Sequence, residues 1–283
     1  MKIDEYFKAK VSCTLSYGVI NLIKEVLNDS QLGLFRETCF GYFLELPKFE
    51  VQCQLIHSLL LRELKQPNLY EFYFDVSGKR LKFGVDEFAL VTGLRCVGNS
   101  MLSSVLLEEN RLITKYFGGL KKINKQSVHE CLLSKRWDND EDCVKIALIY
   151  FIEVFLMSSP MEKMVSRRTF DLVESGFYNE YHWGKDVFHL TMEYMKGNLF
   201  SSENKKKSDW TFYRLNGFPY AVQIWFYECC PFVIDNICVF NGEKNLLIPR
   251  ILNWTCKSNL SYKVLQRLIF KEPLNKVKFV LVI

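Results

Sequence analysis

The sequence predicts a single compact, mainly α-helical domain with one or two small β-hairpins, an α+β arrangement. Apolar residues recur at helical spacing in several segments, and one short stretch alternates as a hairpin does. The chain is also 49% hydrophobic with 23 Phe, enough for a large core. Its 283 residues lie near the upper size for one core, so one large domain or two intimate lobes both fit its length.

Three helices are expected in the first quarter of the chain. The first covers 16–29, where Ser16 is a candidate N-cap, and the second follows over 30–39. A third covers 49–64 and ends before Pro67, because proline cannot continue a helix. These helices supply part of the predicted core.

A β-hairpin is expected over 70–84. Phe72 and Phe74 alternate with polar residues, and Gly78 can supply the positive φ that a tight turn requires. A short helix over 85–94 follows at once. The predicted unit is therefore a hairpin with one helix packed back upon it.

Further helices are expected over 127–137, 143–157 and 185–196, whereas the pattern at 98–125 places no element. The acidic run 138–142 favours a solvated helix start through the helix dipole. The chain ends on the strand-like run VKFVLVI.

The apolar stretch 143–157 is predicted to be a buried helix. It has about 15 residues and carries Lys145 and Glu153, whereas a bilayer span needs about 20 largely uncharged residues. No membrane association is expected.

The stretch NGFPYAVQIWFYECCP is predicted to form a central core helix. Pro219 suits a first helical position, and apolar residues cover all sides, which is typical of a buried helix. The residues expected in the structural core are Phe88, Trp183, Phe218, Pro219 and Trp225.

The domain is predicted to span 16–254. Within it we expect lobes at 16–97 and 126–254, and a mobile polar loop at 197–209. Residues 255–283 are expected to be a C-terminal extension, one that a longer protein would continue.

The ten cysteines are expected to be reduced and mostly buried. The start MKIDEYFKAKVSC has no apolar segment typical of a secretory signal. An intracellular location, nuclear or cytoplasmic, is therefore predicted.

No cofactor or metal is predicted. Cys53 and His57 have a spacing that can hold half a zinc site, but no second pair completes it. The run 138–142 resembles the start of a calcium loop, yet Cys143 stands where that loop requires glycine.

No complete catalytic motif is found. Proteases of ubiquitin-like modifiers carry a His-Trp pair before an Asp-Cys-Gly motif, and here no such motif follows His182. Glu153 and Glu228 lie in apolar helices, where a buried carboxylate can be catalytic but more often meets an Arg or points along a polar edge. We therefore predict that the chain is not an enzyme.

Short basic clusters are the candidate nucleic-acid contacts. They are Lys121, Lys122 and Lys125; Arg167 and Arg168; and Lys205, Lys206 and Lys207. A nucleic-acid footprint and a solvated surface both explain them. The net charge of +5 is well below that of a dedicated nucleic-acid binder.

Four phrases, taken in order, resemble the plant domain of unknown function DUF1985. They are FRETCFGYFLELP, LKFGVDEFALVTGL, YHWGKDVFHLTMEYMK and YRLNGFPYAVQIWFYECCP, and the last is also similar to the related plant mobile domain. The resemblance covers about 16–254. The family phrase usually has Pro where His182 stands, so the Trp-Gly pair belongs to the family pattern.

The resemblance implies a non-catalytic interaction module of a plant transposon-derived protein, which binds protein or nucleic acid. Such domains are often joined to a cysteine protease of ubiquitin-like modifiers. A first alternative is therefore the N-terminal part of such a SUMO-type protease, in which case an in-frame His, Asp and Cys set is expected downstream. A second alternative is a weak nucleic-acid-binding domain. The sequence leaves the partner, the activity and the oligomeric state open.

Overall fold

A computed structural model describes residues 9–65, 67–68, 70–200, 211–230, 233–241, 249–257 and 260–270. Its contacts divide the chain into two compact units. Unit 1 consists of Met1–Thr14, Pro47–Cys96 and Gly184–Ile283, and unit 2 of Leu15–Leu46 and Val97–Trp183. The chain therefore passes from one unit to the other several times, whereas the predicted lobes 16–97 and 126–254 follow one another along the sequence.

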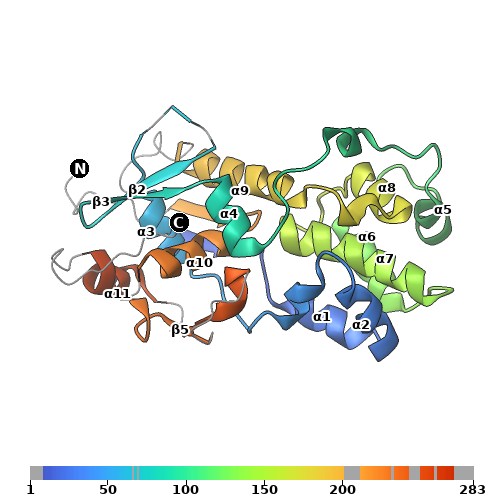
Figure 1. Cartoon of the computed structure of the whole chain (residues 1–283), viewed down its shortest axis with the longest axis horizontal. Helices are drawn as coiled ribbons and strands as arrows, with labels where there is room; N and C mark the ends of the chain where they lie inside the picture. The colour runs from blue at the N-terminus through green and yellow to red at the C-terminus, as the bar shows by residue number, and fades with distance from the viewer. Residues whose placement is uncertain are drawn as a thin grey trace. The chain divides into compact units, whose positions relative to one another are not determined.

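The predicted fold class is confirmed: the described residues are mostly helical, with small two-stranded sheets (Figure 1). Among the helices in the described part of the chain, none combines the length and the apolar character needed to cross a bilayer.

Unit 1 surrounds its short sheets with helices. Its elements are β1 (Ala9–Cys13), α3 (Cys53–Leu60), β2 (Phe72–Val76), β3 (Lys79–Phe83), α4 (Val85–Thr92), α9 (Trp183–Phe200, beyond its first residue), β4 (Thr211–Leu215), α10 (Tyr220–Cys229), β5 (Cys238–Phe240), η7 (Arg250–Asn253), β6 (Trp254–Cys256), α11 (Tyr262–Leu265) and η8 (Gln266–Phe270). Strands β1 and β4 pair in parallel, whereas β2–β3 and β5–β6 are antiparallel.

The predicted hairpin is present as β2 and β3. Phe72, Phe74 and Val76 are fully buried on one face of β2, as the alternation predicted. Ser77 and Gly78 both have positive φ, 52° and 80°, which gives the turn the twist that two-residue hairpins prefer.

The predicted core helix is α10, which packs against the hairpin (Figure 1). Trp225 is 1% exposed and meets the rings of Phe74 and Phe83 at 5.7 and 5.2 Å. Pro219 is the N-cap residue and not the first helical residue, so the predicted start was one residue early. Gly217 is required before it, because its φ is 73° and a Cβ would lie 2.7 Å from the Thr191 hydroxyl.

Unit 2 is built from helices. They are α1 (Gly18–Val26), α2 (Asp29–Arg36), η2 (Gly41–Glu45), η3 (Ser100–Ser104), α5 (Arg111–Phe117), α6 (Lys125–Ser134), α7 (Asp140–Tyr150), η4 (Phe151–Leu156), α8 (Arg167–Ser175) and η5 (Phe177–Asn179). Helices α2, α6 and α8 all pack against α7 (Figure 1). The π-helix η4 continues α7 without a break, and we call the two together the central rod.

An aromatic cluster fixes the central rod in unit 2. Phe151 is fully buried, and its ring contacts other phenylalanine rings at centroid distances between 5.1 and 5.8 Å. These partners are Phe35, Phe40, Phe43 and Phe155. Such clusters stabilise the fold beyond the apolar area that they bury.

The structure corrects several local predictions. The helix expected over 143–157 begins at Asp140 and changes to a π-helix at Phe151. Helix α9 continues to Phe200, so the loop expected at 197–209 does not begin before residue 201. Residues 201–209 and the strand-like end VKFVLVI lie outside the described residues.

The predicted core residues are buried within their respective units. Phe88, Phe218, Pro219 and Trp225 lie in unit 1, and Trp183 lies in unit 2.

Candidate functional site

The structure brings together two of the three basic clusters seen in the sequence. Residues 120–126 and 161–168 meet in unit 2, where 123–126 and 161–165 run antiparallel and Asn124 and Met164 form a bridge between them. The N–H groups of Lys125 and Val165 donate to the carbonyls of Lys163 and Ile123 at 3.0 and 2.8 Å. We call these two segments the basic ribbon. The third cluster, Lys205, Lys206 and Lys207, lies outside the described residues.

The basic ribbon is rich in cations. Its Lys and Arg residues are Lys121, Lys122, Lys125, Lys163, Arg167 and Arg168, and its one carboxylate is Glu162. All of these cations except Lys125 are exposed. The apolar side chains of Leu120 and Met164 lie among them at 59% and 55% exposure.

The two arginines that begin α8 differ in their surroundings. The Arg167 Nε lies 2.9 Å from the buried carboxylate of Asp171, and another of its nitrogens donates to the Leu107 carbonyl at 3.0 Å. Arg168 is exposed, and its guanidinium reaches the Tyr181 hydroxyl at 3.4 Å. Both guanidinium groups therefore have partners within unit 2, and both side chains also reach the surface.

Lys125 was predicted to belong to an exposed cluster, and this is wrong. It is 3% exposed and points inward under the basic ribbon. Its Nζ donates to the Met157 carbonyl at 2.7 Å, to the Ser159 hydroxyl at 2.6 Å and to the Glu153 carbonyl. Lys125 therefore satisfies carbonyls at the C-terminal end of the central rod, where a cation is also favoured by the helix dipole.

Glu153 completes this buried pair. One carboxylate oxygen lies 3.8 Å from the Lys125 Nζ, and the other accepts from the Thr169 hydroxyl at 2.5 Å and from the Ser166 N–H at 3.3 Å. Lys125 thus holds the loop that leads into one strand of the ribbon, and Glu153 holds the start of α8. From the interior of unit 2, the pair therefore holds both segments of the basic ribbon in place.

Burial dominates the titration of this pair. It raises the pKa of Glu153, although the charge of Lys125 and the two donated hydrogen bonds act in the opposite direction. Burial also lowers the pKa of Lys125 to about 8; the charge of Glu153 opposes this and that of Lys163 adds to it.

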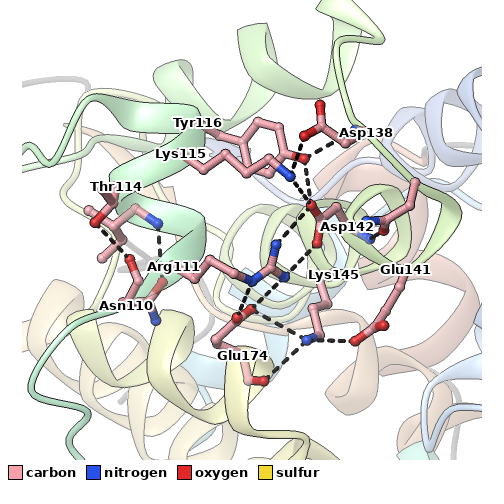
Figure 2. A network of polar contacts seen from close by, with 12 residues as sticks. Asn110, Arg111, Thr114, Lys115, Tyr116, Asp138, Glu141, Asp142, Lys145 and Glu174 are labelled. Atoms are coloured by element: carbon pink, nitrogen blue, oxygen red, sulfur yellow. Dashed lines mark hydrogen bonds and ion pairs between the residues drawn. The ribbon is translucent and has the colours of Figure 1, made fainter.

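A second polar network lies at the other end of the central rod, around Asp142 (Figure 2). Asp142 is 1% exposed, and Asn139 caps the helix by accepting from its N–H at 2.8 Å. Its carboxylate accepts from Arg111 at 2.5 and 3.0 Å, from Lys115 at 2.9 Å and from the Tyr116 hydroxyl at 2.6 Å. The predicted helix start is present, but its last acid is buried and not solvated.

The network continues to α8 through Glu174 (Figure 2). Glu174 lies 2.7 Å from the Arg111 Nε and 3.4 Å from the Lys145 Nζ, and Lys145 also meets Glu141 at 2.8 Å. These donors, Arg111 foremost, hold the pKa of Asp142 well below its usual range. The network thus joins α5, α7 and α8, and the carboxylate of Asp142 is engaged by donors of its own unit.

The cysteine and histidine candidates of unit 1 are built into its interior. His57 is 1% exposed, and its Nδ1 lies 2.8 Å from the Tyr213 hydroxyl. Burial raises the pKa of Cys53 to about 11. Within the described residues, no group of three His, Cys, Asp or Glu side chains could hold a metal ion.

His182 and Trp183 are likewise packed. The His182 ring is buried and stacks on Tyr181 with centroids 4.4 Å apart. The Trp183 Nε1 donates to the Tyr178 carbonyl at 2.9 Å. Glu228 of α10 accepts from the Trp254 indole at 2.5 Å, and burial raises its pKa.

An exposed apolar surface lies at the start of the second segment of unit 2, which begins at Val97. Val97, Met101 and Leu106 are 85%, 75% and 71% exposed. We call residues 97–107 the apolar segment. It lies in the stretch where the sequence pattern predicted no helix or strand. Its apolar residues in a segment without a predicted element could have indicated an exposed apolar surface.

Comparison with protein families gives a match over the middle of the chain. Residues 60–194 match DUF1985, "Domain of unknown function (DUF1985)", so the chain carries a DUF1985 domain at these positions. The resemblance expected over 16–254 is thus confirmed over this narrower stretch. Neither the curated proteins nor the solved structures give a match.

Proposed function

We propose that the chain is a non-catalytic interaction module, and that the apolar segment carries the contact to a protein partner. The observation behind the proposal is the exposure of Val97, Met101 and Leu106 on one short segment. Soluble proteins rarely expose several large apolar side chains close together, and where they do, the surface is often an interaction site. The segment also lies inside the DUF1985 domain at 60–194.

The state of the reactive groups supports a non-catalytic role. A nucleophilic cysteine needs a lowered pKa, and here burial acts in the opposite direction. It raises the pKa of Cys53, Cys96 and Cys131 to about 11, and that of Cys143, Cys229 and Cys238 to about 12. The buried carboxylates of Asp142 and Glu153 are occupied by donors from their own unit.

The DUF1985 match motivates the finer part of the proposal. In this proposal the module belongs to a plant transposon-derived protein, of the kind often joined to a protease of ubiquitin-like modifiers. The module itself would supply binding, and a separate domain would supply any cleavage.

Selection from a displayed library of random 12-residue peptides tests the proposal. Peptides enriched on the wild-type chain are expected to carry apolar residues. Binding should weaken by about tenfold or more in V97S/M101S/L106S. The matched control is L34S/L133S/F177S, which removes three other half-exposed apolar side chains of unit 2 and should bind normally. Circular dichroism melts establish that both variants are folded.

Two results would contradict the proposal. One is equal peptide binding by the wild type and V97S/M101S/L106S. The other is cleavage of a SUMO-type precursor by the purified chain, since that would require a catalytic group in it.

A further inference from the structure

We infer that the basic ribbon is a binding site for the phosphate backbone of a nucleic acid. The inference goes beyond the proposed function, because it adds a second class of partner at a surface other than the apolar segment. It rests on the pairing of residues 120–126 with residues 161–168. The sequence alone shows two separate short clusters, and the fold makes one surface of them.

The charge of the ribbon stands out against its own unit. Unit 2 carries more Asp and Glu than Lys and Arg in total, whereas the ribbon carries six cations and the single acid Glu162. Lys121, Lys122 and Lys163 form no ion pair with any carboxylate of the described residues. Their charges are therefore available to an anionic partner.

The ribbon is held in shape before any partner binds. Backbone hydrogen bonds join its two segments, and the buried Lys125 and Glu153 pin the residues on either side. A surface whose backbone is already fixed loses less conformational entropy on binding than a flexible basic tail does. This distinguishes the ribbon from a run of solvated lysines.

The kind of cation favours nucleic acid over an acidic protein. The three cations without an ion pair in the described part of the chain are all lysines, and lysine is depleted in protein–protein interfaces. Lysine binds phosphate as a point charge and releases condensed counterions when it does so. The exposed apolar groups of Leu120 and Met164 can contact sugars or base edges between the phosphates.

The expected binding is weak and salt-dependent. Each neutralised phosphate contributes about 0.7 to 0.9 to the slope of log K against log salt, so Lys121, Lys122 and Lys163 predict a slope of about −2 to −3. Affinities of non-specific binding lie at about 10⁻⁴ to 10⁻⁶ M at physiological salt. No strong sequence preference is expected, because phosphate contacts do not read bases.

Fluorescence anisotropy on the full chain tests the inference. The probes are a labelled 20-nucleotide oligo(dT), a mixed-sequence duplex and a poly-glutamate peptide of matched charge, at about 50 and 200 mM salt. The variant K121E/K122E/K163E should weaken oligonucleotide binding by about tenfold or more and flatten the salt slope. K24E/K135E/R136E makes the same change of charge elsewhere on unit 2 and is expected to retain most of the affinity.

Every outcome decides the inference. Oligonucleotide binding that the ribbon variant loses and the control variant keeps supports it. Undetectable binding, or equal loss in both variants, overturns it. Poly-glutamate binding as tight as oligonucleotide binding also overturns it, in favour of an acidic protein partner. Peptides selected on the apolar segment should bind K121E/K122E/K163E normally, so failure of this inference is distinct from failure of the proposed function.

Discussion

The two ends of the central rod of unit 2 each bury a carboxylate, and they treat it in opposite ways. Asp142 and Glu153 are nearly equally buried, at 1% and 4% exposure. Yet the pKa of Asp142 is lowered and that of Glu153 is raised. For Asp142 the hydrogen bond from Arg111 is the largest influence on the pKa, whereas for Glu153 burial is the largest.

The partners explain the difference. Asp142 accepts from Arg111 and Lys115, which remain 45% and 30% exposed and keep part of their own hydration. Glu153 faces Lys125, which is as buried as itself and lies 3.8 Å away. A solvated cation at hydrogen-bond distance favours the charged acid strongly, whereas a desolvated and more distant one does not offset the cost of burial. The comparison teaches that several charged and polar donors at hydrogen-bond distance can outweigh the burial of a carboxylate, whereas a single cation 3.8 Å away does not.

The largest expected effect comes from breaking the buried pair. Lys125→Met should cost about 3 to 5 kcal/mol of unfolding free energy, because it removes the buried charge that faces Glu153 and the donor of the helix-end carbonyls. Urea denaturation at neutral pH measures it. Lys163→Met, which changes the exposed neighbour on the ribbon, should stay within about 0.5 kcal/mol. Equal effects in the two variants would show that the buried pair has no special role.

A pH titration sharpens the same end of the comparison. The pKa of Lys125 is lowered to about 8 in the fold from 10.5, so the unfolded chain binds more protons than the folded one between these values. The contribution of Lys125 to stability should therefore rise with pH, by roughly 1 kcal/mol per pH unit between 8 and 10. The measured quantity is the stability difference between wild type and Lys125→Met. A difference that shrinks over this range would contradict the assignment.

The contribution of Asp142 to stability should be lost at acidic pH, whereas that of Lys125 changes at alkaline pH. Asp142→Asn keeps the shape but removes the charge that Arg111 and Lys115 bind, and should cost about 1 to 3 kcal/mol at neutral pH. Because the pKa of Asp142 is lowered from 3.8, wild type should lose this advantage as the pH falls below about 4. The exposed Asp138→Asn serves as control and should have little effect. A gap between Asp142→Asn and wild type that persists unchanged at pH 2 would refute the pKa assignment.

Local patterns predicted the elements of the fold better than its sites. The hairpin of β2 and β3 and the helix α10 follow from residues close together in the chain, and the structure places both. Helices α5 and α8 were not predicted, since their apolar spacing is short and interrupted by charge.

The sites depend on pairings that no local pattern contains. Lys125 follows two exposed lysines in sequence, so it reads as a third surface cation, and only the position of Glu153, 28 residues later, explains its burial. The sequence did flag Glu153, because a carboxylate in an apolar helix needs a partner. It could not name that partner, because the meeting of residues 120–126 with 161–168 is a tertiary contact.

The smallest expected effect tests whether solvent exposure also determines how much each ion pair of the Asp142 network contributes to stability. Glu141 is 73% exposed and forms an ion pair with Lys145, so Glu141→Gln should cost less than about 0.5 kcal/mol. Glu174 is 13% exposed and bridges Arg111 and Lys145, so Glu174→Gln should cost about 1 kcal/mol or more. Both changes remove one negative charge near the same lysine, and urea denaturation at low and high salt compares them directly. The Glu141 pair should weaken further in salt, because screening acts on exposed charges first. If the two variants were equally stable under both conditions, solvent exposure would not be what ranks these contacts, and the contrast between the two ends of the rod would need another cause.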